Sequence, residues 1–308
     1  MAPRAAGVRV GGAGIVVFDI DNGHRFVRRI ETPDSRAKKP ENIKGIGANA
    51  KTKSLYYSTL TRLAKIDLVT EESAWDKTLE GGCDRFAMTP DGSKLYVPSL
   101  EGPHWNVVDA KTGDLLRRIE TKSGSHNTLI SIDGSRAYLA GLRSPMLVVA
   151  DTRSDKALGT VGPFAASIRP FTVNGSGTLC FVNINDLLGF EIGDFRTGKK
   201  ILRVEVQGVE KGTPKRHGCP SHGIALSPNE KEIWVCDAAN QKMHVFDVTK
   251  LPPIQRESID VRDEPGWIMF SIDGSYAYPS TGDVIDAGTK KVVAQLTDEN
   301  GRAVGSEK

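Results

Sequence analysis

Short alternating runs of apolar and polar residues, separated by turn residues, recur along this chain, and the clearest set spans residues 86–119. Four such runs lie there, and alternation with a period of two predicts β-strands that bury one face. The junctions between the runs carry Pro90-Asp91-Gly92, Glu101-Gly102-Pro103 and Lys111-Thr112-Gly113. Because Pro, Gly and Asp favour tight turns, we predict a four-stranded antiparallel meander.

Such a small sheet has two exposed faces when it stands alone, so copies of it must stack to bury enough apolar surface. Copies begin at Thr128, Pro170, His222 and Trp267, and a degenerate copy begins at Ile43. No linker rich in Pro, Ser or Gly interrupts them. We therefore predict that residues 1–308 form a single domain.

An aspartate closes the third strand of each copy. These aspartates are Asp19, Asp67, Asp109, Asp151, Asp194, Asp247 and Asp286. Neighbouring aspartates are 39 to 53 residues apart, close to the roughly 40–45 residues of one propeller blade. Seven aspartates predict an all-β fold, a seven-bladed β-propeller with four antiparallel strands in each blade.

The predicted blades have the approximate bounds 8–30, 43–80, 84–120, 127–161, 168–206, 221–261 and 266–296, and residues 297–308 start a closing strand. The predicted innermost strands are Phe86–Met88, Leu129–Ser131, Phe171–Val173, Gly223–Leu226 and Ile268–Phe270. The chain enters in the middle of a blade, with Val8–Val10 as a remnant second strand. We therefore expect a chain that is cut at both ends and lacks one closing strand, which leaves a free sheet edge.

A turn motif recurs in three copies: Ser131-Ile132-Asp133-Gly134 with Tyr138, Ser271-Ile272-Asp273-Gly274 with Tyr276, and Thr89-Pro90-Asp91-Gly92 with Tyr96. With this motif the chain resembles the YVTN-repeat family of seven-bladed β-propellers, related in shape to surface-layer and cytochrome d1-like propellers. The resemblance covers nearly all of residues 14–296. It implies a propeller fold and, because members are commonly exported, a periplasmic or secreted protein, although Met1–Val10 holds no signal peptide.

Composition excludes several kinds of partner. The net charge is +3, and the basic clusters 36–39 and 211–216 lie in predicted loops without interleaved aromatic residues, so we interpret them as solvated charge and expect no nucleic-acid partner. No run approaches the roughly eighteen apolar residues that a membrane span needs. We expect a monomer without a membrane span.

Cofactor motifs are also few. The glycines mark two-residue turns and no helix follows them, so no nucleotide is expected. Cys219-Pro-Ser-His222 is not the CxxCH motif of a c-type haem, so no haem c is expected. Cys180 and Cys236 fall on second strands and are predicted to be core residues, whereas Cys83 and Cys219 fall near the predicted site.

In a propeller, the segments that join each outermost strand to the next innermost strand converge on one mouth of the central channel, where functional residues gather. In this sequence those segments are polar. They carry Glu41, Asp84, Arg85, His126, Asn127, Arg169, His222 and Trp267.

His126 and His222 occupy equivalent positions of two of these segments. They are candidate catalytic residues and candidate ligands of a divalent metal, with Glu41 or Asp84 completing the set, because imidazole nitrogen and carboxylate oxygen suit zinc or manganese. The alternative is that each histidine caps a turn or binds water.

Arg85 and Arg169 are candidate ligands of a substrate carboxylate, with Asn127 beside them. The alternative is that the arginines pair with acidic residues of the same ring, such as Asp84. Trp267 is a candidate for stacking on a sugar or planar ligand, and the alternative is that it packs between blades.

The segment Gln207–Pro220 is an insertion between two copies, and it contains His217. Loops of this length act as functional lids or are disordered. We predict a flap that covers the same mouth.

Two functions follow. The first is binding of a small molecule at the channel mouth, and one version of it is the site of a metal-assisted lyase or hydrolase. The resemblance implies a lactone or sugar-derived substrate. The second is a non-catalytic extracytoplasmic scaffold that binds a protein partner through the channel face.

Overall fold

The computed structural model describes residues 14–32, 38 and 41–306 of the chain, which form an all-β protein with one short 3₁₀ helix. These residues group into two compact units. Unit 1 comprises the described residues 14–32, 38, 186–190 and 204–306, and unit 2 comprises residues 41–185 and 191–203. No described helix is long and apolar enough to cross a membrane.

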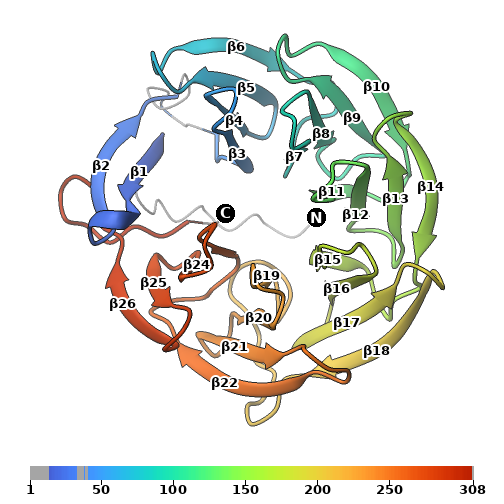
Figure 1. Ribbon diagram of the computed structural model, residues 1–308, viewed down its shortest axis with the longest axis vertical. Helices are drawn as coiled ribbons and strands as arrows, with labels where there is room; N and C mark the ends of the chain where they lie inside the picture. Colours follow the sequence, from blue (N-terminus) through green and yellow to red (C-terminus); the bar gives the residue numbers. More distant parts are fainter. Residues whose placement is uncertain (1–13, 33–37, 39–40, 307–308) are drawn as a thin grey trace. The chain divides into compact units, whose positions relative to one another are not determined.

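Unit 2 contains three complete blades and most of a fourth, each a four-stranded antiparallel sheet in chain order. The strands are β3 (Gly45–Asn49), β4 (Ser54–Ser58), β5 (Arg62–Asp67) and β6 (Ser73–Thr78); β7 (Ala87–Met88), β8 (Lys94–Pro98), β9 (His104–Asp109) and β10 (Leu115–Glu120); β11 (Ser125–Ile130), β12 (Arg136–Gly141), β13 (Leu147–Asp151) and β14 (Lys156–Val161); and β15 (Ile168–Val173), β16 (Leu179–Ile184), β17 (Gly189–Asp194) and β18 (Lys199–Glu205). The first strands β3, β7, β11 and β15 lie along one edge of the unit and the last strands along the opposite edge (Figure 1).

Unit 1 contains two further four-stranded blades and a two-stranded sheet. The blades are β19 (Ile224–Leu226), β20 (Glu232–Asp237), β21 (Lys242–Asp247) and β22 (Ile254–Asp260), followed by β23 (Ile268–Phe270), β24 (Tyr276–Pro279), β25 (Asp283–Asp286) and β26 (Lys291–Gln295). The two-stranded sheet pairs β1 (Ile15–Asp19) with β2 (Arg25–Ile30), and the 3₁₀ helix η1 (Ile20–Asn22) joins them.

The described residues form six complete blades, so the prediction of seven is wrong. Each repeated aspartate marks the turn between a third and a fourth strand, and for that reason the aspartates count hairpins rather than blades. Asp19 closes the hairpin β1–β2, which has no inner strands within the described residues. The predicted remnant strand Val8–Val10 lies outside them. The five predicted innermost strands overlap β7, β11, β15, β19 and β23.

The recurrent turn motif has a hydrogen-bond explanation. Asp133 Oδ1 accepts hydrogen bonds from the hydroxyl of Ser131 at 2.5 Å and from the backbone N–H of Ser135 at 3.0 Å. Ser131 Oγ in turn accepts from the N–H of Arg136 at 2.9 Å. The same network surrounds Asp273. Hydroxyl and carboxylate thus satisfy the backbone donors of a tight turn, which is why Ser and Asp recur there.

The core of unit 2 lies between neighbouring blades. Trp105 of β9 is fully buried in a cluster that includes Leu139 and Val148 of the following blade. Its indole N–H donates a hydrogen bond to the hydroxyl of Thr128 at 2.8 Å. Apolar contacts and a satisfied buried donor therefore join these two blades. Cys180 and Cys236 are fully buried on β16 and β20, as predicted, and all four cysteines are free thiols.

In unit 1, the two-stranded sheet packs on the last blade. Arg29 of β2 forms a bidentate ion pair with Glu299, at 2.8 Å from Nη2 and 3.2 Å from Nε. The buried ring of His24 meets Tyr276 edge to face at 4.5 Å. The segment predicted to start a closing strand forms a turn, in which Asp298 accepts the N–H of Arg302 and Thr297 bridges to Ala303.

Candidate functional site

Unit 2 brings together three of the predicted site residues from neighbouring blades. Asp84 and Arg85 lie just before β7, and His126 lies on β11. The backbone of Asp84 is held on both sides, because its N–H donates to the carbonyl of Pro98 and its carbonyl accepts from the hydroxyl of Ser58. These three residues form what we call the Asp84–His126–Arg85 cluster.

The imidazole of His126 contacts both charged groups of this cluster. Its Nδ1 is 2.5 Å from Oδ2 of Asp84, and its Nε2 is 2.6 Å from Nη1 of Arg85. Nη1 of Arg85 also lies 3.0 Å from Nδ1 of His126 and 3.3 Å from Oδ1 of Asp84. A carboxylate only accepts hydrogen bonds and a guanidinium only donates them. These distances assign the proton to Nδ1, so that His126 donates to Asp84 and accepts from Arg85.

Burial and charge set the protonation of the cluster. Burial would raise the pKa of Asp84, but the hydrogen bond from His126 and the nearby positive charges lower it overall. Burial, followed by the charge of Arg85, lowers the pKa of His126. Burial lowers the pKa of Arg85 to about 10, and Asp84 opposes that shift. At neutral pH the cluster therefore holds a carboxylate, a neutral imidazole and a guanidinium.

Arg169, on β15 of the next blade, acts on the same cluster. Its charge lowers the pKa of both Arg85 and His126, so the two guanidinium groups lie within electrostatic reach of each other. Its Nε donates to Oδ1 of Asn185 at 2.5 Å. Asn127 follows His126 on β11, and its buried Nδ2 has no hydrogen-bond partner within the described residues.

Glu41 serves a local role in unit 2. Its carboxylate accepts hydrogen bonds from the hydroxyl of Thr59 at 2.5 Å and from the N–H of Thr61 at 3.2 Å. Although burial would raise the pKa of Glu41, these hydrogen bonds lower it overall. The carboxylate thus stabilises the turn that precedes β5.

His222 and Trp267 lie in unit 1, where they contact each other. Their rings meet edge to face at 4.9 Å, and His222 Nδ1 lies 2.9 Å from the carbonyl of Gly266. The ring of His217 packs on His222 at 5.1 Å. These contacts agree with the alternative role of a turn cap for His222 and of packing for Trp267.

Within residues 14–32, 38 and 41–306, no group of three or more His, Cys, Asp or Glu side chains is arranged to hold a metal ion. His126 has Asp84 and Arg85 on its two ring nitrogens. A metal ion at His126 would have to displace one of them. A metal shared by His126 and His222 stays a prediction.

The insertion Gln207–Pro220 contains no helix or strand, and Glu264 holds it in place. Arg216 pairs with Asp263 at 2.8 Å and with Glu264 at 3.2 Å. The interpretation of cluster 211–216 as solvated charge is therefore wrong for Arg216, whose acidic partners lie 47 and 48 residues later. Sequence reasoning missed this pairing because no local pattern connects the two segments.

Comparison with known proteins supports the fold. The structure resembles that of hydrazine synthase from Kuenenia stuttgartiensis, with a TM-score of 0.67 and 17% sequence identity over 86% of this chain and 83% of that chain. No protein-family model matches the chain, and no curated protein is similar to it in sequence. Together with six four-stranded blades, the likeness supports a β-propeller, and at this identity it shows the fold alone.

Proposed function

We propose that this β-propeller binds a small carboxylate-containing molecule through Arg85 and Arg169 in unit 2. The observation that carries the proposal is a buried guanidinium, Arg85, held by His126 and Asp84 within reach of a second guanidinium. Asp84 offsets part of the charge of Arg85, but the charge of Arg169 still lowers the pKa of Arg85, so an anion between the two guanidinium groups would interact favourably with both. Guanidinium groups bind carboxylates through two parallel hydrogen bonds.

In this proposal, His126 and Asp84 are positioning residues. The neutral imidazole accepts from Arg85 and donates to Asp84, which holds the planar guanidinium in one orientation. A rigid, preorganised group loses less conformational entropy when a ligand binds. The buried amide nitrogen of Asn127 supplies a further donor on the same strand.

The contacts of His126 favour binding over metal-assisted hydrolysis or elimination. A catalytic base needs a ring nitrogen directed at the substrate, and here both ring nitrogens contact Asp84 or Arg85. The non-catalytic scaffold is the competing function, and the resemblance to YVTN-repeat propellers is compatible with both. Export from the cytoplasm remains a proposal on that resemblance.

Isothermal titration calorimetry with acetate, malonate and succinate tests this function. We expect at least one of these carboxylates to bind, and Arg169→Ala to weaken its affinity about tenfold or more, since a charge-assisted pair is lost. Arg153→Ala is the matched control, because Arg153 is exposed in the same unit. Equal loss in both variants, or no binding of any carboxylate, would favour the scaffold.

A further inference from the structure

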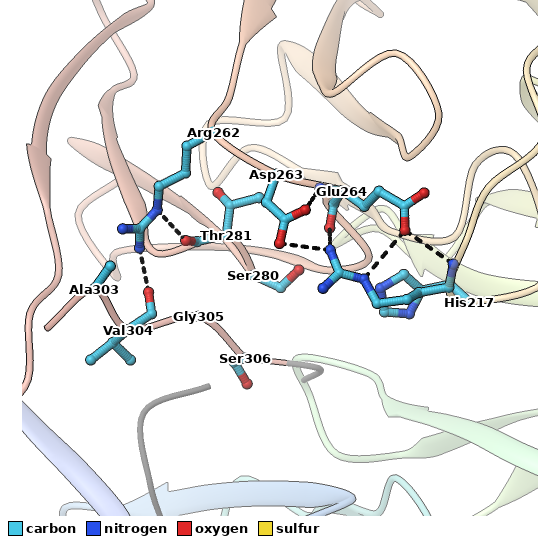
Figure 2. A pocket seen from close by; sticks show the side chains of 11 residues that line it. His217, Arg262, Asp263, Glu264, Ser280, Thr281, Ala303, Val304, Gly305 and Ser306 are labelled. Carbon is cyan, nitrogen blue, oxygen red and sulfur yellow. Dashed lines mark hydrogen bonds and ion pairs between the residues drawn. The ribbon is translucent and has the colours of Figure 1, made fainter. Parts of the chain in front are cut away.

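A separate pocket of about 220 Å³ lies in unit 1 (Figure 2). Residues 216–217 of the insertion form one wall, residues 262–264 and 280–281 form a second, and residues 303–306 form a third. We call it the unit 1 pocket. It is independent of the Asp84–His126–Arg85 cluster, which belongs to the other unit.

One carboxylate that lines this pocket is already saturated by donors of the protein. The side chain of Glu264 is 4% exposed. Its Oε1 accepts from the N–H of Lys215 at 2.6 Å, and its Oε2 accepts from the N–H of Arg216 at 3.0 Å and from Nε of Arg216 at 3.2 Å. Glu264 therefore holds the insertion and offers little to a ligand.

Three other groups retain donors. Arg262 donates from Nε to the carbonyl of Thr281 at 2.6 Å and from Nη2 to the carbonyl of Val304. Arg216 uses Nε and Nη2 on the acidic residues 263 and 264. Neither Nη1 has an acceptor among the described residues. Ser280 Oγ accepts from the N–H of Gly266 at 2.9 Å, and its own proton likewise has no acceptor in the described part of the chain.

Asp263 supplies an accessible acceptor at the pocket. Its side chain is 53% exposed, and its Oδ2 lies 2.8 Å from Nη2 of Arg216. Although burial would raise the pKa of Asp263, the hydrogen bond from Arg216 lowers it overall. Asp263 is therefore a carboxylate at neutral pH and retains free lone pairs for a cationic donor.

The charges that line the pocket balance. Among the arginine and acidic side chains that line it, Arg216 and Arg262 contribute two positive charges, and Asp263 and Glu264 contribute two negative charges. Behind the lining, the buried carboxylate of Asp283 lies 3.6 Å from Nε of Arg262. Figure 2 shows Arg262, Asp263 and Ser280 around the same space, with residues 303–306 beneath them. A balanced site with separated donors and acceptor suits a ligand that is neutral as a whole but carries both charges.

We propose that the unit 1 pocket binds a small zwitterion, an α-amino acid of the size of glycine or alanine. Its carboxylate accepts hydrogen bonds from Arg262 and Ser280, and its ammonium group pairs with Asp263. A guanidinium edge and a hydroxyl group match the two oxygens of a carboxylate, and a half-exposed carboxylate matches an ammonium group. The volume of about 220 Å³ accommodates a molecule of that size.

Calorimetry on the unmodified protein tests the proposal with glycine, acetate and methylamine as probes. Glycine carries both charged groups, whereas each of the other two carries one, so we expect glycine to bind at least about tenfold more tightly than either. Acetate binding that is as tight as that of glycine and persists in Arg169→Ala overturns the proposal, and so does methylamine binding as tight as that of glycine. So does the absence of glycine and alanine binding at millimolar concentrations.

Two variants refine this test. Asp263→Asn removes the charge that faces the ammonium group, so it should weaken glycine binding about tenfold or more and leave acetate binding equal or stronger. Asp260→Asn is the matched control, because Asp260 is an exposed carboxylate that pairs with Lys242 outside the pocket. Equal loss of glycine binding in both variants overturns the assignment of Asp263. Circular dichroism and melting curves confirm that each variant is folded.

Discussion

Asp84 Oδ2 and His126 Nδ1 lie 2.5 Å apart, although 42 residues separate them in the sequence. That separation equals the spacing of Asp67, Asp109 and Asp151, the aspartates that end the third strands of neighbouring blades. The two residues therefore occupy equivalent positions in adjacent repeats. Stacking of the blades brings the carboxylate of one repeat onto the imidazole of the next.

Asp84→Ala should cost about 3–5 kcal/mol of unfolding free energy, because it leaves the guanidinium of Arg85 buried without its carboxylate. Urea unfolding followed by circular dichroism measures this. Asp114→Ala is the control, since Asp114 forms an exposed pair with Lys77. We expect no measurable loss for the control. Equal effects of both changes would contradict a buried charge pair at Asp84.

Stability should fall as the pH is lowered through the range in which histidine titrates. The pKa of His126 is lowered in the folded protein, so its contribution is present above the ordinary value of about 6.5 and is lost as the pH decreases below it. Urea unfolding of the unmodified protein and of His126→Gln between pH 7.5 and 5 tests this. The variant should show a shallower decline. Part of the decline that remains in the variant comes from His24 and His104, whose pKa values are lowered mainly by burial.

The turn aspartates should give a second loss at lower pH. Hydrogen bonds from the hydroxyl and N–H groups of the turn lower the pKa of Asp133 and of Asp273 to about 2. Their contribution is present above the unfolded value of about 3.9 and is lost as the pH falls toward 2. Carboxyl chemical shifts followed by NMR during an acid titration measure both values. A midpoint near 4 for both would refute the hydrogen-bond network.

Trp105→Ala should cost about 3–5 kcal/mol, because it opens a cavity in the core between two blades of unit 2. Thr128→Val keeps the shape of the neighbouring side chain but leaves the buried indole N–H without its acceptor, which should cost about 1–3 kcal/mol. Unfolding in guanidinium chloride measures the loss of unfolding free energy for each variant. If Thr128→Val leaves the free energy of unfolding unchanged, the hydrogen bond at 2.8 Å contributes little to stability.

Gly266→Ala should loosen the insertion Gln207–Pro220. A Cβ at position 266 would lie 2.2 Å from Nε2 of His217, so the ring must move away. We expect trypsin to cleave faster after Lys215 and Arg216, because mobile loops are the preferred sites of proteolysis. Gly159→Ala is the control, since a Cβ there meets nothing within 4 Å. Unchanged cleavage of Gly266→Ala would show that His217 does not anchor the segment.

Local sequence patterns were enough to predict the strands and turns. The alternation around Trp105 and the Asp-Gly turn at Asp133 each have a physical cause within a few residues, so the blades were predictable. The number of blades was not, because Asp19 closes a hairpin just as the other six aspartates do, but no inner strand pairs with that hairpin among the described residues.

The candidate site was predictable where the repeat itself supplies the geometry. Asp84 and His126 are one repeat apart, so repeat phasing placed both among the polar segments of the predicted mouth, although it did not predict their direct contact. Arg216 and Glu264 are 48 residues apart across an insertion that breaks the repeat, and no spacing rule connects them. The pocket donors Arg262 and Ser280 depend on that pairing, and therefore only the folded chain reveals them.

The pairing of Arg29 with Glu299 joins positions 270 residues apart in the sequence. During synthesis, residues 41–185 of unit 2 leave the ribosome as one nearly continuous stretch and can fold early. The hairpin β1–β2 must instead wait until the last blade of unit 1 has been made. Contacts of such long range are slow to form, so we expect the docking of β1–β2 against the blade β23–β26 to be a late step of folding.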